Sequence, residues 1–285
     1  MTTARRAALL LGAALIFTAP WAAIPLAAKE WPRIRIATEG AYPPFNMHAP
    51  DGRLIGYEID LAADLCRRMA ARCEVVAQDW DGIIPGLQAG KYDAIMAGMA
   101  ITPRRMEVIA FSAPYVSTPS SFAALKGTPL AGLPGADTRV SLADAAAFKG
   151  AVEALRAKLK GKVVGVQVAT AQAEFLNTHF KGVAEIRTYK TTEEHDLDLH
   201  AGRLDAVFAD APYLRASQEK AGGADLVFTG PQFAGGALGA GTGVGLRKSD
   251  PELKAKFDEA IAASTADGTL KRLVLQWFKL DATPQ

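Results

Sequence analysis

The stretch Gly56-Tyr57-Glu58-Ile59-Asp60-Leu61 opens the segment that decides the fold. Over residues 58–70 the apolar side chains recur at helical spacing and acids occupy the first turn, which predicts an amphipathic helix. Residues 34–38 before it and 73–77 after it are predicted strands, the first by its alternation of apolar and polar side chains. A strand, a helix and a second strand in this order predict two parallel strands with a helix packed across them.

The alternation of strands and helices continues along the chain. Further strands are predicted at residues 92–96, 163–168, 186–189 and 204–209, and helices at 82–89, from 102, at 141–160, from 170 or 171, at 192–201, from 250 and at 270–278. Ser141 is the predicted N-cap of the helix at 141–160, and the residues 127–140, rich in Gly and Pro, are predicted to form a loop. The sequence therefore belongs to the α/β class, with parallel sheets covered by helices on both faces.

The composition excludes one class of partner. The chain has 285 residues, of which 49% are hydrophobic and 22% charged, the balance of a globular protein with a sizeable core. Its formal charge is +2, and Arg5 and Arg6 account for it: the other 30 basic residues (32 less these two) match the 30 acidic ones, none of which lies in residues 1–28. A neutral chain offers no basic surface to nucleic acid, so none is expected as a partner.

The N-terminus has the features of a targeting segment. Two arginines precede an apolar run at residues 7–17, and the small residues Ala27 and Ala28 come before the charged Lys29. This is the order of a secretory signal peptide, so residues 1–28 are predicted to direct export to the periplasm. A retained membrane anchor is the alternative, but the apolar run has only about half the length that spans a bilayer.

The two cysteines, Cys66 and Cys73, are able to pair in an exported chain, because its compartment is oxidising. Seven residues of unbroken helix span about 10.5 Å, whereas the Cα atoms of a disulfide lie roughly 4.4–6.8 Å apart. A bridge therefore requires the helix to end between the two cysteines, near Ala71. Metal binding is the rival interpretation, although no nearby His completes a ligand set.

Several motifs of cofactor or catalytic sites fail on inspection. Gly239, Gly241, Gly243 and Gly245 alternate without the spacing of a dinucleotide fingerprint, and no P-loop or nucleophile elbow occurs. A pair of histidines, 195 and 200, is five residues apart, so the two do not share a helix face as metal ligands would. No cofactor and no metal are therefore expected.

Motifs spread over the mature chain resemble those of the family 3 extracellular solute-binding proteins, the amino-acid receptors of ABC importers. The run that opens at Gly56 is one of them, and the others lie, in the family's order, at residues 81–87, 92–95, 101–105, 109–112, 202–206 and 243–248. The sequence is most similar to binders of lysine/arginine/ornithine, histidine and octopine/nopaline. Cys66 and Cys73 fall where the lysine/arginine/ornithine binders have a small disulfide loop.

The resemblance implies the type II periplasmic-binding-protein fold, two lobes that each have a sheet flanked by helices and that are joined by two hinge strands. Residues 29–119 and 239–285 would form the first lobe, and residues 120–238 the second lobe with the hinge segments. Such proteins capture a ligand by hinge closure and present it to a membrane permease. A monomer is expected.

The resemblance also assigns the groups that would bind an amino acid. Arg105 matches the arginine that grips the ligand carboxylate with its planar fork, and Asp210 matches the acid that receives the α-ammonium. Thr170, with Gln172 beside it, would offer a backbone N–H and a hydroxyl to the carboxylate at a helix start. The plainer alternatives are a surface arginine, a helix cap at Asp210 and simple N-capping by Thr170.

The side chain of the ligand would lie between Tyr42 and Trp80, which match an aromatic pair of the family. Glu39 stands where binders of cationic amino acids have an acid, so a ligand with a distal positive group is predicted. Core packing of Trp80 and a solvent-facing Glu39 are the alternatives. Gln167 completes the binding residues together with three small ones where the lysine/arginine/ornithine binders have serines: Ala97, Gly98 and Ala100.

These departures leave the ligand open. Ala100 lacks a hydroxyl that would touch the carboxylate, and the pairing of Glu39 with Trp80 is most similar to the opine-binding branch. Asp210, by contrast, suits the free α-ammonium of arginine itself. Two other functions remain as alternatives: a dehydratase on the same fold, with Glu39 as general acid, and a sensor protein that presents its ligand to a receptor.

Overall fold

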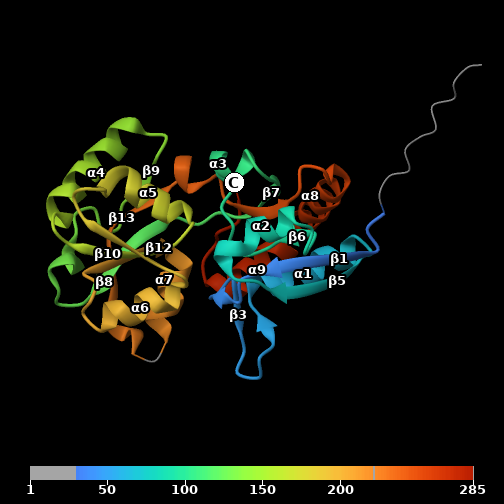
Figure 1. The fold of residues 1–285 in the computed structure, drawn as a ribbon, viewed down its shortest axis with the longest axis horizontal. Coiled ribbons are helices and arrows are strands. Elements are labelled where there is room, and N and C mark those ends of the chain that lie inside the picture. The colour runs from blue at the N-terminus through green and yellow to red at the C-terminus, as the bar shows by residue number, and fades with distance from the viewer. Residues whose placement is uncertain (1–29, 221, 285) are drawn as a thin grey trace, which may run out of the picture.

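The computed structural model describes residues 30–220 and 222–284, so the predicted signal peptide at residues 1–28 lies outside the described residues. The chain forms two α/β lobes side by side, each built on its own β-sheet (Figure 1). The first and last parts of the described chain share the first lobe, and the long middle part forms the second lobe. Within the described ranges no helix is both long and apolar enough to cross a bilayer.

The first lobe contains a five-stranded sheet in the order β5-β1-β6-β14-β7. Strand residues alternate between the two faces of the sheet. Ile34 and Ile36 therefore pack against α1, α8 and α9, whereas Ala37 and Ile95 face the short helix α2. The strands are β1 (Arg33–Thr38), β5 (Arg72–Ala77), β6 (Ala94–Ile95), β7 (Ala110–Val116) and β14 (Thr242–Leu246), and the helices are α1 (Tyr57–Arg68), α2 (Ile83–Gln88), α3 (Pro103–Met106), α8 (Pro251–Ala266) and α9 (Thr269–Phe278).

The second lobe contains a six-stranded sheet in the order β11-β10-β12-β8-β13-β9. Phe122, Val164 and Phe208 pack against α4 and α5, while Val207 and Ala209 face α6 and α7. The strands are β8 (Ser120–Leu125), β9 (Arg139–Ser141), β10 (Val163–Gln167), β11 (Glu185–Tyr189), β12 (Ala206–Asp210) and β13 (Leu226–Ala234), and the helices are α4 (Ala145–Leu159), α5 (Ala171–Phe180), α6 (Thr192–His200) and α7 (Ala211–Glu219).

Both sheets are mixed, and the prediction of purely parallel sheets is wrong. Strand β14 runs antiparallel to β6 and β7, and β8 runs antiparallel to β12 and β13. The reason is the exchange of chain between the lobes. Strand β7 leaves the first lobe where β14 returns to it, and β8 enters the second lobe where β13 leaves it, so each neighbouring pair points in opposite directions.

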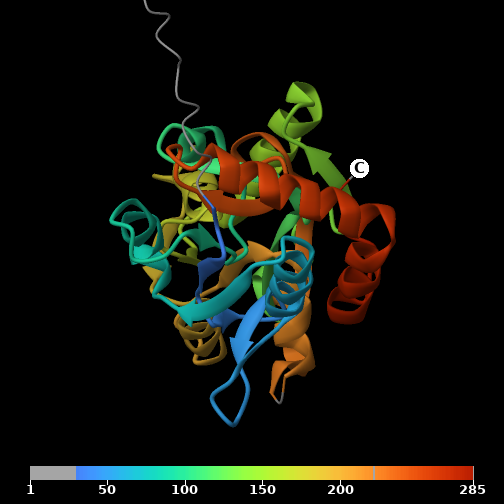
Figure 2. The same cartoon turned by 90° about the vertical axis from the view of Figure 1, so that its right-hand side faces the viewer.

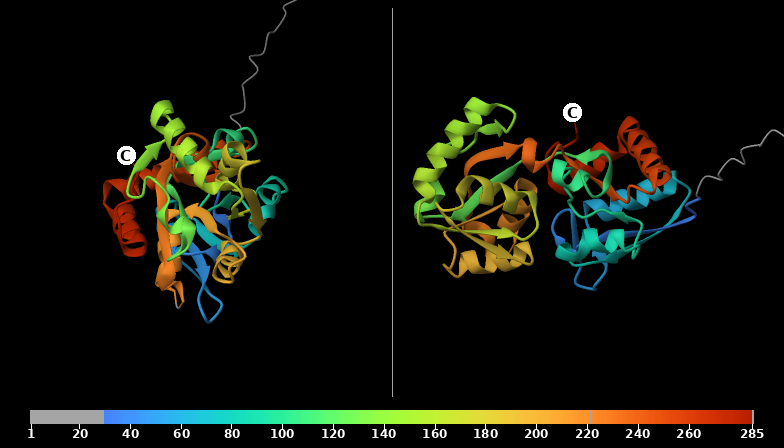
Figure 3. Two further views of the ribbon diagram at one scale, coloured as in Figure 1. Left: turned by 90° about the vertical axis from the view of Figure 1, so that its left-hand side faces the viewer. Right: turned by 45° about the horizontal axis from the view of Figure 1, so that its top comes forward.

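Two connections join the lobes, residues 117–119 between β7 and β8 and residues 235–241 between β13 and β14 (Figure 3, right). In the second connection Gly239 and Gly241 have φ angles of +100° and +106°, a region that favours glycine. The C-terminal segment packs beside the first connection, since the backbone N–H of Ser117 donates to the carbonyl of Ala282 at 2.9 Å. The last residues of the chain thus brace the point where it crosses between lobes.

A small antiparallel sheet of β2 (Ala41–Tyr42), β3 (Asn46–His48) and β4 (Leu54–Ile55) extends from the first lobe. Its β3–β4 hairpin projects away from the body of the molecule (Figure 2). The sequence predicts only a loop at residues 42–45, because Pro43 and Pro44 exclude a helix. The short sheet brings Tyr42 to the face that looks toward the second lobe.

Two further local predictions have clear outcomes. Ser141 does not cap a helix: it ends β9, and Asp144 caps α4 by accepting the backbone N–H of Ala147 at 3.0 Å. The predicted end of the helix between the cysteines is confirmed, because α1 ends at Arg68 and the chain then turns back into β5. Cys66 and Cys73 form a disulfide with their Cα atoms 6.1 Å apart.

Candidate functional site

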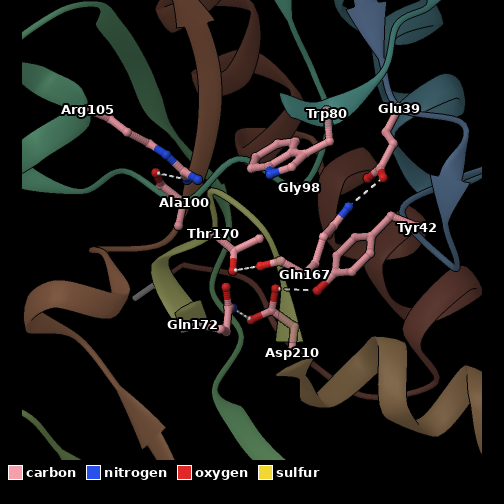
Figure 4. Close-up of a pocket in the computed structure, with 11 residues that line it drawn as sticks. Glu39, Tyr42, Trp80, Gly98, Ala100, Arg105, Gln167, Thr170, Gln172 and Asp210 are labelled. Atoms are coloured by element: carbon pink, nitrogen blue, oxygen red, sulfur yellow. Dashed lines mark hydrogen bonds between the residues drawn. The ribbon is translucent and has the colours of Figure 1, made fainter. Parts of the chain in front are cut away.

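A small cavity lies between the two lobes, and all of the predicted ligand-binding residues line it (Figure 4). They come from two separate stretches of chain, residues 39–105 and 167–210, which the fold brings together. The first lobe contributes Glu39, Tyr42, Trp80, Ala97, Gly98, Ala100 and Arg105, and the second lobe contributes Gln167, Thr170, Gln172 and Asp210.

The topology of the sheets explains this convergence. Glu39 follows β1, Gln167 ends β10 and Asp210 ends β12. The carboxyl ends of parallel strands meet at one edge of each sheet, where open α/β sheets bind ligands. The two edges face each other, so side chains from both lobes point into the space between them (Figure 4).

Arg105 is buried, with 9% of its surface exposed, so the surface-arginine alternative is wrong. Its guanidinium lies 5.1 Å from the ring centre of Trp80 and donates to the carbonyls of Ala100 at 3.0 Å and Ala169 at 3.2 Å. Burial lowers the pKa of Arg105 to about 10, which leaves it a cation at neutral pH. Both of these acceptors are neutral carbonyls, and among the residues that the structure describes no carboxylate forms an ion pair with its guanidinium.

Asp210 collects three hydrogen bonds at the opposite wall. Its carboxylate accepts from the Tyr42 hydroxyl at 2.8 Å, the Ser120 hydroxyl at 3.1 Å and the Gln172 amide at 3.0 Å. Burial raises its pKa to about 6, although these bonds oppose the rise. The side chain of Asp210 makes no capping bond to α7, so the helix-cap alternative does not account for it.

Glu39 does not face water, as one alternative proposed. Its side chain is buried and accepts a hydrogen bond of 2.6 Å from the amide of Gln167 in the other lobe. Burial raises its pKa to about 7, and the bond from Gln167 only partly offsets this. When desolvation raises the pKa of a buried carboxyl to near neutral pH, a cation bound beside it lowers that pKa and favours the ionised form.

The two aromatic residues, Tyr42 and Trp80, each lie partly in the core and partly on the cavity wall. Tyr42 stacks on Tyr213 of the second lobe, with ring centres 5.2 Å apart and planes 3° apart, and also on Phe45 at 5.3 Å. Trp80 packs in the core with Ile83, so the core-packing alternative holds, yet its ring also walls the cavity beneath Arg105. Both residues therefore combine core and cavity positions.

Two short segments complete the walls. Thr170 is the N-cap of α5 and accepts the N–H of Ala173 at 3.0 Å, so its capping role is present together with its place in the cavity. Gly98 has a φ angle of +61°, and a Cβ there would lie 3.1 Å from the Tyr42 ring. Only glycine fits at this position without strain or displacement of that ring.

The lobes are closed on each other around the cavity. Besides the bonds of Glu39 and Asp210, the Trp80 indole donates to the carbonyl of Val168 at 3.0 Å. At the rim, Lys190 pairs with Asp79 at 2.7 Å across the gap. Each of these contacts joins the first lobe to the second, so the same surfaces that line the cavity also hold the lobes together.

Several residues at the site escaped the sequence interpretation. Ser120 faces Asp210 because the two are register partners in the antiparallel pair β8 and β12, a pairing that no local pattern reveals. Tyr213 supports Tyr42 from another lobe. The sequence predicts Glu58 as an acid of a first helical turn within a family motif, without a place at the site. It is fully buried and accepts the backbone N–H of Gly98 on the cavity wall.

The side chains that commonly bind metals form no cluster in the described residues. Within residues 30–220 and 222–284, no group of three His, Cys, Asp or Glu side chains is placed to hold a metal ion. His195 is buried in α6 with its Nδ1 3.0 Å from Asp196, and it does not line the cavity.

Two α/β lobes that meet over a polar, charge-lined cavity define a solute-binding protein. The comparison with known families agrees: the model of the bacterial extracellular solute-binding proteins, family 3, matches residues 34–280, and the chain belongs to this family.

Individual relatives cover nearly the whole chain. The octopine-binding periplasmic protein of Rhizobium meliloti is 46% identical over 277 residues, covering 90% of this chain and 94% of its own. The L-arginine-binding protein of Pseudomonas aeruginosa is 36% identical over 262 residues, covering 90% and 92%. Among solved structures, a periplasmic His/Glu/Gln/Arg/opine family-binding protein from Silicibacter pomeroyi in complex with lysine has a TM-score of 0.71 at 38% identity and covers 88% of this chain and 99% of its own.

Proposed function

We propose that this protein is the periplasmic substrate-binding component of an ABC importer for cationic amino acids or arginine-derived opines. The proposal depends above all on one observation: Arg105, Asp210 and Glu39 present one positive and two negative side chains around a single closed cavity. A ligand that neutralises all three carries one carboxylate and two cationic groups. Arginine, lysine and ornithine have this charge pattern.

Each group of such a ligand has a partner of opposite charge. The carboxylate would bind the guanidinium of Arg105, close to Thr170 at the positive end of α5. The α-ammonium would bind Asp210, and the distal cation would lie against Glu39 between the Trp80 and Tyr42 rings. Because buried charges without partners are costly, a ligand that lacks any one of these groups should bind less tightly.

Closure of the lobes would complete the site. We place the first lobe at residues 29–119 and 239–285, the second at residues 120–238, and the hinge in the two connections. Arg105 and Glu39 lie on one lobe and Asp210 on the other, so a bound zwitterion joins both. A ligand favours closure only through contacts that are better in the closed state, and these charges meet that condition. The permease would then recognise the closed outline.

Opines fit the same argument with one addition. In an arginine-derived opine the α-nitrogen carries an additional carboxyalkyl group. The ligand therefore needs more room, and its α-nitrogen offers one N–H fewer to Asp210. Ala97 and Ala100 are small side chains on the cavity wall, whereas the Tyr42 ring packs over Gly98, so an opine would be accommodated by movement of that ring or of the lobes. The octopine-binding relative is 46% identical to this chain, which supports including opines among the ligands.

The dehydratase alternative is less well supported by the charges. Its substrate prephenate is a dicarboxylate without a cation, and Glu39 and Asp210 would repel it when ionised. The relatives described above are named as binding proteins. Purified protein that converts prephenate or arogenate would nevertheless overturn the binding-protein assignment.

Calorimetric titration with arginine, lysine, ornithine, histidine, octopine, nopaline and glutamate tests the proposal. At least one cationic ligand or opine should bind tightly and glutamate should not. Arg105→Ala should then weaken binding by about 3 kcal/mol or more, because it leaves the ligand carboxylate buried without a partner. Arg53→Ala is the control, since Arg53 is an exposed arginine whose ion pair to Asp51 lies within its own hairpin and not between the lobes. Equal affinities for the two variants would remove Arg105 from the site.

A further inference from the structure

Two segments of the first lobe line the cavity, residues 39–42 and residues 97–100. The Tyr42 ring packs against Gly98, and buried hydrogen bonds also connect the two segments. Asn46 accepts the backbone N–H of Gly40 at 2.7 Å through Oδ1 and donates through Nδ2 to Glu58 Oε2 at 2.7 Å. Glu58 Oε1 in turn accepts the backbone N–H of Gly98 at 2.8 Å. Gly40 adjoins Glu39, and Gly98 itself lines the cavity.

The carboxylate of Glu58 has a third donor. The hydroxyl of Tyr115, near the end of β7, also donates to Oε1, and Tyr115 is completely buried. Strand β7 leads directly into the connection between the lobes. One acid therefore joins both ligand segments of its lobe to the strand that enters the hinge.

Burying this hydrogen-bonded carboxylate costs desolvation free energy. Glu58 and Asn46 are both fully buried, and burial raises the pKa of Glu58 even though its three donors oppose the rise. A buried carboxylate held by neutral donors is expensive compared with an apolar residue of similar size. An acid in the first turn of α1 is favourable at the helix start, but a solvent-exposed acid would supply that benefit too.

We propose that Glu58, with Asn46, is a positioning residue that fixes the two ligand-contacting segments of the first lobe relative to each other, so that the lobe presents a preformed half-site. The inference rests on the proposed function of the cavity and names the residues that shape it. Preformed geometry reduces the ordering cost of binding, so loss of the connection should appear as weaker affinity for every ligand of the cavity.

The polarity of the chain of bonds allows a specific test. Gly40 and Gly98 offer N–H groups that are fixed by the backbone, so the two side chains between them must be one amide and one carboxylate. Glu58→Gln puts an NH₂ group against the NH₂ of Asn46, and turning the Asn46 amide only moves the conflict to Gly40. Asn46→Asp instead sets two carboxylates against each other, a conflict that the pair can relieve only by binding and sharing a proton. The double variant N46D/E58Q restores every donor and acceptor with the same net charge.

The experiment measures the affinity of wild type, both single variants and the double variant for L-arginine, its uncharged isostere citrulline and octopine, with denaturant unfolding in parallel. Glu58→Gln should bind about tenfold or more weakly, because a buried donor loses its partner. Asn46→Asp should show the same loss only at a pH high enough to remove the proton that its two carboxyls share. The loss should be equal for arginine and citrulline, and the double variant should return to within about threefold of wild type. Asp64→Asn is the control on the same helix: its ion pairs to Arg67 and Arg68 are remote from the cavity, so stability should fall and affinity should not.

The possible results separate the two proposals. If the wild type binds none of these three ligands and none of lysine, ornithine, histidine and nopaline, the proposed function fails. If it binds and a folded Glu58→Gln variant binds equally well, the positioning role is refuted while the function stands. If the single variants do not fold, the double variant decides: near-normal affinity supports the proposal, and a double variant that binds weakly or does not fold overturns it.

Discussion

Acidification should weaken the binding of arginine to this protein much more than the binding of citrulline, which has the same shape without the distal charge. The reason is Glu39, whose buried carboxyl has its pKa raised to about 7. Below that pH the acid holds its proton and offers no charge to the guanidinium of the ligand. Binding of arginine therefore strengthens as the pH rises through 7, because more of the protein carries the ionised acid.

The size of the effect follows from the pKa of Glu39. With a pKa of about 7, roughly 3% of Glu39 is ionised at about pH 5.5 and roughly 90% at about pH 8. The ratio is about 30-fold, or about 2 kcal/mol of binding free energy. Asp210, with a pKa of about 6, also titrates in this range, but it faces the α-ammonium that both ligands share. Its contribution cancels when the two affinities are compared at each pH.

Isothermal titration calorimetry from about pH 5.5 to about pH 8 measures the ratio of arginine to citrulline affinity. In the wild type the ratio of arginine to citrulline affinity should rise by up to about 30-fold over this pH range. In Glu39→Gln it should stay flat, because the amide does not titrate, and arginine should lose its advantage. Parallel pH profiles for the two ligands in the wild type would refute the assignment of Glu39 to a distal cation.

Two further predictions concern other parts of the fold. Replacing Cys66 and Cys73 together with serine should lower the free energy of unfolding by about 2.5 kcal/mol, the loop entropy of so short a ring. Ligand affinity should not change, because neither residue lines the cavity, and a loss of affinity in calorimetry would contradict this. Gly98→Ala should weaken binding, because its Cβ would press on the Tyr42 ring at 3.1 Å. Gly90→Ala has a similar positive φ with nothing within 4 Å, so it should reduce stability alone; equal losses of affinity in both variants would show that the contact with Tyr42 is irrelevant.

Local patterns in the sequence were sufficient to predict most elements and the chemical types at the site. The helix that begins near Glu58, the N-cap at Thr170 and the end of the helix between the cysteines all depend on neighbours within a few residues. The candidate binding residues followed from motif resemblance, which marks positions such as Arg105 and Asp210 without placing them. That these side chains line one cavity became visible only in the structure.

What the sequence determined by itself was most of the helices, the strands β1, β5, β6, β10, β11 and β12, and the charges available for binding, because backbone propensity and residue chemistry act over short distances along the chain. The tertiary structure alone decided the mixed strand directions, the pairing of Ser120 with Asp210 and the burial of Glu58 against Gly98. These depend on segments that are 40 or more residues apart in the chain. Their contact is set by how two sheets exchange strands and close, which is a property of packing and not of any local pattern.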